Sequence, residues 1–204
     1  MICYEVLFLK IYLIRHSESE DDDIDAYGGI SDFPLNEKGQ KDAELVAEKL
    51  KDVKFDVIFT SPYLRAKQTA EKIAEKCGCP LTEVYNLRER NSYGVVSGVT
   101  KELAKQVFPW ITERIIWMKK QGTKPGYSNE TLPGAENYLE FVVRVKEGLK
   151  EVLRSDKELV GIVSHGGVCH CIGKEILGTE VKLPKTEFRI LEGNNLEDLE
   201  LVTP

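Results

Sequence analysis

The feature that most constrains the fold is an apolar run at residues 4–14, which stops abruptly at a charged pair. Its side chains are β-branched and aromatic with no polar alternation, which is typical of a strand buried on both faces. Short runs of a similar kind occur at 55–60, 80–85 and 158–164, and segments with helical periodicity separate them. We therefore expect an α/β fold with a mostly parallel central sheet and helices on both faces.

The expected helices carry boundary signals of their own. Asn36 is a typical N-cap, and apolar residues recur at helical spacing from there to Leu50. Helical spacing resumes at Leu64 and ends before Gly78. The other expected elements are a loop at 17–34, helices at 99–120, 135–154 and 168–177, and closing strands at 186–192 and 196–202 joined by a hairpin turn at Gly193-Asn194.

Composition and charge exclude several classes of protein. Of the 204 residues, 42% are apolar and 30% are charged, which is unlike a disordered or membrane-spanning chain. The formal net charge of −6 argues against binding nucleic acid but permits a small anionic substrate in a locally basic pocket. Five cysteines without a signal sequence ahead of them favour reduced thiols and a cytoplasmic location.

Charged residues gather at the ends of the expected strands. Arg15 and His16 follow the first strand, and Arg65 lies just after the second. Glu89 follows the third strand between two arginines, and His165 ends the fourth. Because ligands of open parallel sheets bind beyond the carboxyl ends of the strands, we expect these side chains to converge on one crevice suited to phosphate chemistry.

Taken singly, each of these residues has an ordinary structural interpretation. A histidine at a strand end is more often a hydrogen-bonded structural residue, and a lone arginine or glutamate is usually a solvated charge. The acidic run from Glu18 to Asp25 is by default a solvated loop. The functional interpretation rests on the combination, since two of the chain's three histidines, His16 and His165, end apolar strands.

The motifs LIRHSES, LNEKGQ, SPYLRAKQTAE, LRER and SHGGV occur in this order along the chain. Together they resemble the histidine phosphatase superfamily, also called the phosphoglycerate mutase-like family. The resemblance covers about residues 10–178. It implies a phosphoglycerate mutase-like three-layer sandwich and a phosphohistidine intermediate formed from a small phosphorylated substrate.

The resemblance implies a role for each matched residue. His16 matches the nucleophile that takes up the phosphoryl group. Arg15, Arg65 and His165 match the residues that hold the phosphoryl oxygens, and Glu89 matches the general acid. Since arginines and a histidine supply the positive charge, neither a metal nor another cofactor is expected. The residues expected to contact substrate are Arg15, Ser17, Asp22, Gly29, Arg65, Arg90, His165 and Gly166.

Two residues depart from the family pattern. Ser17 stands where a glycine usually follows the Arg-His pair, although its hydroxyl can still donate to a phosphate oxygen. Asp22 stands where an asparagine commonly helps to bind phosphate, and a carboxylate facing the anion would repel it. We therefore expect Asp22 to turn away or its loop to be shifted.

We expect residues 1–204 to form one domain. By comparison with the family, residues 1–9 are an N-terminal extension, either a lengthened first strand or the product of an upstream start codon. Residues 91–135 are expected to cover the substrate, and their aromatic side chains belong either to a lid or to a core.

The activity is narrowed to three alternatives. A phosphatase is favoured over a mutase because the interval from Glu89 to His165 is short and lacks the adjacent Arg-Arg pair that mutases carry. A non-catalytic phosphate-binding module would be expected to have lost His16 or Glu89, and both are present. The substrate's identity and the choice between monomer and homodimer stay open, and neither nucleic acid nor a membrane is expected as a partner.

Overall fold

The computed structural model describes residues 8–122 and 132–202. Within these ranges six strands form one sheet in the order β3-β2-β4-β1-β5-β6. The four strands β1 to β4 pair in parallel, whereas β5 and β6 are antiparallel, so the sheet is mostly parallel as predicted. The strands are β1 (Leu9–Arg15), β2 (Val57–Thr60), β3 (Leu81–Glu83), β4 (Leu159–Ser164), β5 (Phe188–Gly193) and β6 (Glu200–Leu201).

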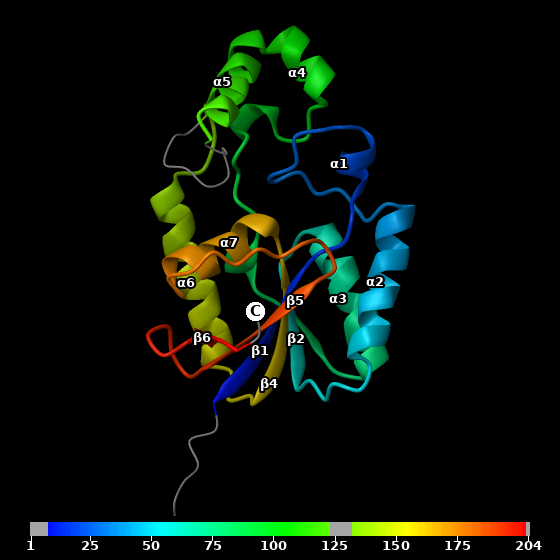
Figure 1. Ribbon diagram of the computed structural model, residues 1–204. Helices are drawn as coiled ribbons and strands as arrows, with labels where there is room; N and C mark the ends of the chain where they lie inside the picture. The colour runs from blue at the N-terminus through cyan, green and yellow to red at the C-terminus, as the bar shows by residue number, and fades with distance from the viewer. Residues whose placement is uncertain (1–7, 123–131, 203–204) are drawn as a thin grey trace, which may run out of the picture.

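Helices cover both faces of the sheet and give three layers (Figure 1). One face carries α2 (Glu37–Leu50) and α3 (Leu64–Cys77), and the other carries α6 (Tyr138–Leu153) and α7 (Gly166–Glu175). Each helical layer buries its apolar side chains against the sheet in a separate core. The prediction of an α/β sandwich is confirmed.

The central strand β1 is buried on both faces. Ile11 and Leu13 belong to the core beneath α6 and α7, whereas Ile14 belongs to the core beneath α2 and α3. This two-sided burial explains why the strand's sequence lacks polar alternation. Leu9, which we placed in the extension, begins β1 and is buried opposite Gly193. Residues 1–7, which make up most of the expected extension and include the start of the expected strand, lie outside the described residues.

The predicted helix ends are set by local chemistry. The Asn36 side chain accepts a hydrogen bond from the Gly39 amide (2.7 Å), which confirms it as the N-cap of α2. Helix α3 ends at Cys77, and the Gly78 that follows has a φ of +68°, a left-handed conformation that glycine adopts without strain. The helix expected at 99–120 is divided at Phe108, because a proline starts the second part and favours the first position of a helix.

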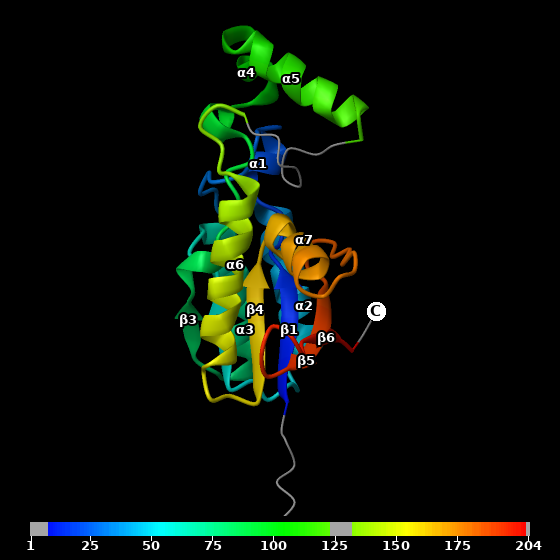
Figure 2. The same ribbon diagram turned by 90° about the vertical axis from the view of Figure 1, so that its left-hand side faces the viewer.

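A smaller unit stands beyond the carboxyl ends of the parallel strands (Figures 1 and 2). It contains α1 (Glu20–Asp23), the 3₁₀ turn η2 (Gly94–Val96), α4 (Lys101–Val107) and α5 (Pro109–Lys120). An apolar cluster of its own joins η2, α4 and α5 to two loop residues; its members are Tyr27, Val96, Ala104, Ile111, Ile115, Met118 and Leu132. Part of the segment predicted to cover the substrate therefore lies at the end of the sheet where ligands bind.

Besides the division of the helix expected at 99–120, three local predictions were wrong. The loop expected at 17–34 contains the single helical turn α1, in which the Ser19 amide donates to the Asp22 carboxylate (3.1 Å). Helix α7 begins at Gly166, two residues early, because His165 is itself the N-cap. The link between β5 and β6 spans 194–199 instead of a two-residue turn. No helix in the described ranges is long and apolar enough to cross a bilayer.

Candidate active site

His16 lies at the carboxyl end of β1, where its amide donates to the Ser164 carbonyl of β4 (2.9 Å). Its ring is buried, and Nδ1 lies 2.6 Å from the carbonyl oxygen of Ser17. Because a carbonyl oxygen can only accept, this contact requires the proton on Nδ1 and leaves a lone pair on Nε2. The imidazole is thus held in the tautomer that a nucleophile needs.

His165 ends β4 and brings a second imidazole beside the first. The two ring centroids lie 5.0 Å apart. His165 is fully buried, and its Nε2 shares a hydrogen bond of 2.7 Å with the Ser61 hydroxyl, which follows β2. The strand ends of β1, β2 and β4 therefore build one site, as the sequence predicted for a parallel sheet.

Burial keeps both imidazoles neutral. Burial is the main cause that lowers the pKa of His16 well below its ordinary value, and the charge of Arg65 adds to the effect. The same two causes lower the pKa of His165. A neutral imidazole retains the lone pair that attacks phosphorus, whereas an imidazolium does not.

The two predicted arginines are fixed by main-chain carbonyls. Arg65, in the first turn of α3, is buried and donates to the carbonyls of Gly29 (2.9 Å) and Ser31 (2.6 Å). Arg15 donates from one terminal nitrogen to the Leu183 carbonyl (3.1 Å). These anchors leave other guanidinium N–H groups for an oxyanion.

Polar atoms without a partner concentrate at this site. In the described part of the chain, the buried side-chain atoms that lack a hydrogen-bond partner are Arg15 Nε, Ser17 Oγ, His165 Nδ1 and the distant Ser155 Oγ. Buried polar groups are nearly always hydrogen-bonded, so a cluster of unpartnered ones is a physical sign of a binding site. An N–H, a hydroxyl and an imidazole suit the oxygens of a phosphoryl group.

Glu89 reaches the same site from the segment after the 3₁₀ turn η1 (Tyr85–Leu87). Its Oε2 accepts from the Gly167 amide (3.0 Å), and its Oε1 accepts from the Arg90 amide (2.9 Å). A Cβ at position 167 would lie only 2.3 Å from Glu89 Oε1. The second glycine of the His-Gly-Gly motif is therefore needed to admit the carboxylate beside the histidine.

The segment that carries Glu89 is held by residues that the sequence did not reveal. Arg144 of α6 donates to the carbonyls of Asn86 (2.9 Å), Arg88 (2.8 Å) and Glu89 (3.1 Å). The Arg144 guanidinium also forms a two-pronged ion pair with Glu136 (2.6 and 2.8 Å) in a mostly buried setting. Arg144 therefore positions the backbone that carries the Glu89 carboxylate. Only the folded chain brings Arg144 to this segment.

Three further residues predicted to contact substrate lie in the site. Ser17 is fully buried, and its amide donates to Thr69 Oγ1 (3.1 Å). The Gly29 carbonyl accepts the hydrogen bond from Arg65 described above. Gly166 packs against Arg15, since a Cβ there would lie 3.2 Å from the guanidinium carbon.

The two remaining predicted contacts are engaged elsewhere. Arg90 is buried, and its Nε (3.1 Å) and one terminal nitrogen (2.8 Å) donate to the Glu136 carbonyl, so its guanidinium is committed to the start of α6. Asp22 pairs its carboxylate with the ammonium of Lys185. That Asp22 turns away from the anion, or that its loop is shifted, stays a prediction.

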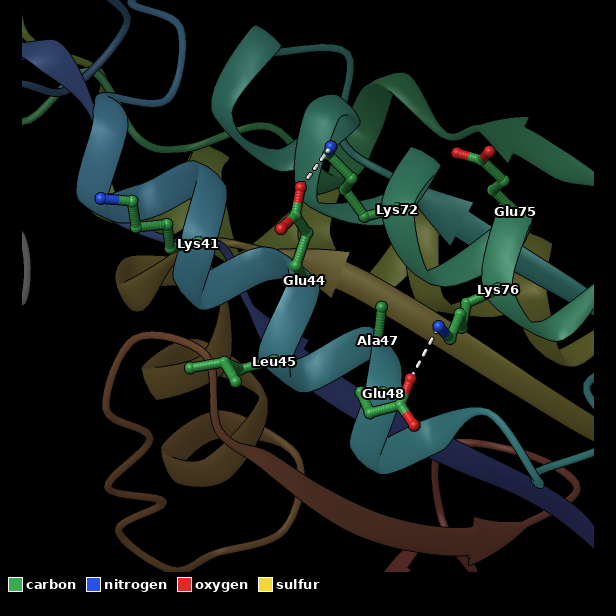
Figure 3. Close-up of a pocket in the computed structure, with 8 residues that line it drawn as sticks. All are labelled: Lys41, Glu44, Leu45, Ala47, Glu48, Lys72, Glu75 and Lys76. Carbon is green, nitrogen blue, oxygen red and sulfur yellow. Dashed lines mark hydrogen bonds and ion pairs between the residues drawn. The ribbon is translucent and has the colours of Figure 1, made fainter.

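Other parts of the described chain offer less for catalysis. The groove between α2 and α3 in Figure 3 carries charges that neutralise one another, because Lys72 pairs with Glu44 (3.0 Å) and Lys76 with Glu48 (2.7 Å). No group of three or more His, Cys, Asp or Glu side chains suited to hold a metal ion occurs among the described residues.

Fold and site together define an α/β enzyme suited to phosphate chemistry at a pair of buried histidines, and comparison with known proteins agrees. Residues 11–195 match the profile of the histidine phosphatase superfamily (branch 1). The chain belongs to this family, as its motifs predicted.

Two related sequences carry the names of different activities, a phosphatase and a mutase. The "Uncharacterized phosphatase PhoE" of Bacillus subtilis (strain 168) is 30% identical over 179 residues, which cover 87% of this chain and 82% of the relative. The "Probable phosphoglycerate mutase GpmB" of Salmonella typhi is 33% identical over 175 residues, which cover 83% of this chain and 75% of the relative.

Solved structures share the fold across nearly the whole chain. A mycobacterial glucosyl-3-phosphoglycerate phosphatase superposes with a TM-score of 0.77 at 20% identity, covering 96% of this chain and 98% of its own. The alpha-ribazole phosphatase of Shigella flexneri gives a TM-score of 0.76 at 20% identity, with 95% and 94% covered. At these identities the likeness supports the fold.

Proposed function

We propose that the protein hydrolyses small phosphomonoesters through a phosphohistidine at His16. The observation that carries this proposal is the fixed tautomer of His16, whose Nε2 lone pair lies in a buried site beside a second imidazole and two arginines. Family membership and the phosphatases among its relatives support the reaction class.

In the first step, Nε2 of His16 forms a bond to phosphorus as the bond from phosphorus to the substrate oxygen breaks. The N–H groups of Arg15 and Arg65 stabilise the oxygens of the transferring group, together with Nδ1 of His165 when that nitrogen carries the proton. Glu89 gives its proton to the departing oxygen, so the alcohol leaves neutral.

In the second step, a water oxygen attacks phosphorus and the bond to His16 breaks. Glu89, now a carboxylate, accepts the proton from that water. Inorganic phosphate leaves, and both side chains return to their starting states. Residues 91–135 contribute substrate specificity in this proposal, because their helices stand at the open end of the sheet (Figure 2).

A phosphoglycerate mutase is the second candidate, favoured by the relatives that carry that name. The two activities differ in where the phosphoryl group goes, to water or back to a substrate hydroxyl. Release of inorganic phosphate from 3-phosphoglycerate, without formation of 2-phosphoglycerate, would support the hydrolase.

The first experiment measures hydrolysis of p-nitrophenyl phosphate with and without excess EDTA. We expect activity to survive chelation and to be inhibited by vanadate, because fixed arginines supply the charge that a metal would otherwise provide. Loss of activity on chelation, restored by magnesium, would contradict the mechanism.

We further propose a cytoplasmic location, since the buried Cys169 and Cys171 are free thiols, as in a reducing compartment.

A further inference from the structure

The loop between α7 and β5 brings a lysine to the edge of the candidate site. This loop is tied to Arg15: the Thr186 amide donates to the Arg15 carbonyl (3.1 Å), and the Arg15 amide donates to the Glu187 carbonyl (3.2 Å). The Arg15 side chain adds a third link to Leu183 (3.1 Å). Lys185 lies within the segment 183–187 that these three hydrogen bonds join to Arg15.

The backbone beside Lys185 is strained. Thr186 has a φ of +61°, a left-handed conformation that a β-branched residue rarely adopts. Its hydroxyl donates to the Lys185 carbonyl (2.6 Å), which helps to hold this turn. Strain of this kind persists where the surrounding structure demands it, and it concentrates at binding and catalytic sites.

The Lys185 ammonium pairs with the Asp22 carboxylate, and both side chains are partly buried. Burial alone would raise the pKa of Asp22, but the hydrogen bonds from Lys185 and the Ser19 amide, together with the charges of Lys185 and Arg15, hold that pKa below its usual value. The same ammonium is close enough to His16 to lower its pKa, after the larger effects of burial and Arg65. Lys185 therefore acts electrostatically on both the acidic loop and the nucleophile.

We propose that Lys185 is a substrate-binding residue, whose ammonium both neutralises Asp22 and donates to the phosphoryl oxygens. An ammonium carries three N–H donors, and within the described residues Asp22 is the acceptor that this one contacts. Without the lysine, the Asp22 carboxylate would face the bound anion unpaired. The proposal rests on the proposed function for its ligand, a phosphoryl group.

The test is the binding of inorganic phosphate, measured by titration calorimetry on the whole protein at constant salt. We expect Lys185→Met to weaken phosphate binding by about 10- to 100-fold, as for the loss of a charge-assisted hydrogen bond near an uncompensated charge. Lys182→Ala is the matched control, because this lysine lies on the same loop and its side chain is 82% exposed. We expect that control to stay within about twofold of the parent protein.

A second variant separates binding from loop structure. Asp22→Asn in the Lys185→Met background removes the unpaired carboxylate, so we expect it to recover about half of the loss on a logarithmic scale. A purely structural lysine would not give this recovery. Phosphate affinity in Lys185→Met within twofold of the Lys182→Ala control would overturn the proposal. So would a weakening that Asp22→Asn leaves unchanged, or the loss of folded protein in both Lys185→Met and Lys185→Ala.

The calorimetric readout keeps this proposal distinct from the catalytic one. If phosphate binding depends on Lys185 but the parent protein hydrolyses no phosphomonoester, the binding role stands and the proposed function fails. If the parent protein hydrolyses p-nitrophenyl phosphate and phosphate binding does not depend on Lys185, the proposed function stands and the binding role of Lys185 fails.

Discussion

The two sides of the candidate site are held in place by different means. On the nucleophile side, His16 and His165 end neighbouring strands whose register is fixed by a continuous ladder and two apolar cores. On the acid side, Glu89 lies on an irregular segment. Arg144, on a helix far away in sequence, holds this segment by donating hydrogen bonds to its carbonyl groups. The proposed nucleophile is thus placed by the sheet, and the proposed acid by one charged network.

The interactions that hold the sheet together are therefore different from those that position Glu89. The apolar cores hold the end of β1, and His16 is not part of them, so replacing its side chain should leave the strand in place. The Arg144 side chain itself holds the backbone of the Glu89 segment, so changing it should cost stability as well as activity. Variants on the two sides should therefore differ in how much stability accompanies a loss of activity.

The largest effect is expected on the nucleophile side. His16→Ala should abolish turnover and the acid-labile phosphoenzyme, because the Nε2 lone pair is lost. The fold should remain, with a melting temperature within a few degrees of the parent. His170→Ala is the matched histidine control and should keep its activity. Phosphate trapped on His165 instead of His16 would show that the two imidazoles have been assigned in the wrong order.

Next in size is the effect of Glu89→Gln, which keeps the shape of the acid but removes its proton. For alkyl phosphates, whose leaving group needs protonation, we expect kcat to fall about 10²- to 10⁴-fold. For p-nitrophenyl phosphate the loss should be much smaller, since the phenolate leaves without a proton. Equal losses on both substrates would make Glu89 structural, and the donor would then be sought at Glu18, Glu20 or Asp22.

A smaller effect on rate is expected when Arg144 is changed to Lys. A lysine keeps the charge but loses the planar fork that serves Glu136 and the carbonyls together. We expect kcat for alkyl phosphates to fall about tenfold, with stability lower by about 1–3 kcal/mol. Arg154→Lys, at the exposed end of the same helix, is the control. If Arg144→Lys slows p-nitrophenyl phosphate as strongly as alkyl phosphates, the arginine does not act through the acid.

The smallest effect concerns stability and pH. The folded-state pKa values of His16 and His165 lie below the ordinary 6.5, so the unfolded chain binds protons that the folded one does not. Stability should be fully present above pH 6.5 and fall as the pH falls below it, by about 1 kcal/mol per histidine at about pH 5.5. Urea unfolding in a phosphate-free buffer measures this slope. A His16→Asn/His165→Asn double variant with the same slope as the parent would show that other groups cause it.

The contrast also explains what the sequence could predict. A buried strand followed by Arg15 and His16 is a local pattern, as are the Asn36 cap and the Gly78 stop, and the structure places each as expected. Glu89 was identified through its motif, not through periodicity. Arg144 and Lys185 gave no such signal, because the carbonyls that Arg144 contacts and the carboxylate that Lys185 contacts lie far away in sequence, and only the packed fold joins them.

The single turn α1 was missed for a different reason. Its acidic side chains suggested a solvated loop, yet Ser19 followed three residues later by Asp22 is a capping arrangement that the sequence does contain. A composition-based interpretation outweighed a local hydrogen-bonding pattern. For Asp22 the sequence predicted a side chain that turns away or a shifted loop, but it did not predict the ion pair with Lys185.

The strand order has a consequence for how the protein is made. β1 pairs with β4 and β5, which follow it only in the last quarter of the chain. A ribosome must therefore deliver residues 159–193 before the strand that presents His16 finds its neighbours, and closing such long loops slows folding. Until then β1 exposes two unpaired edges and two apolar faces. Assembly of the site therefore waits for the last quarter of the chain, and unpaired edges and apolar faces of this kind favour aggregation in the meantime.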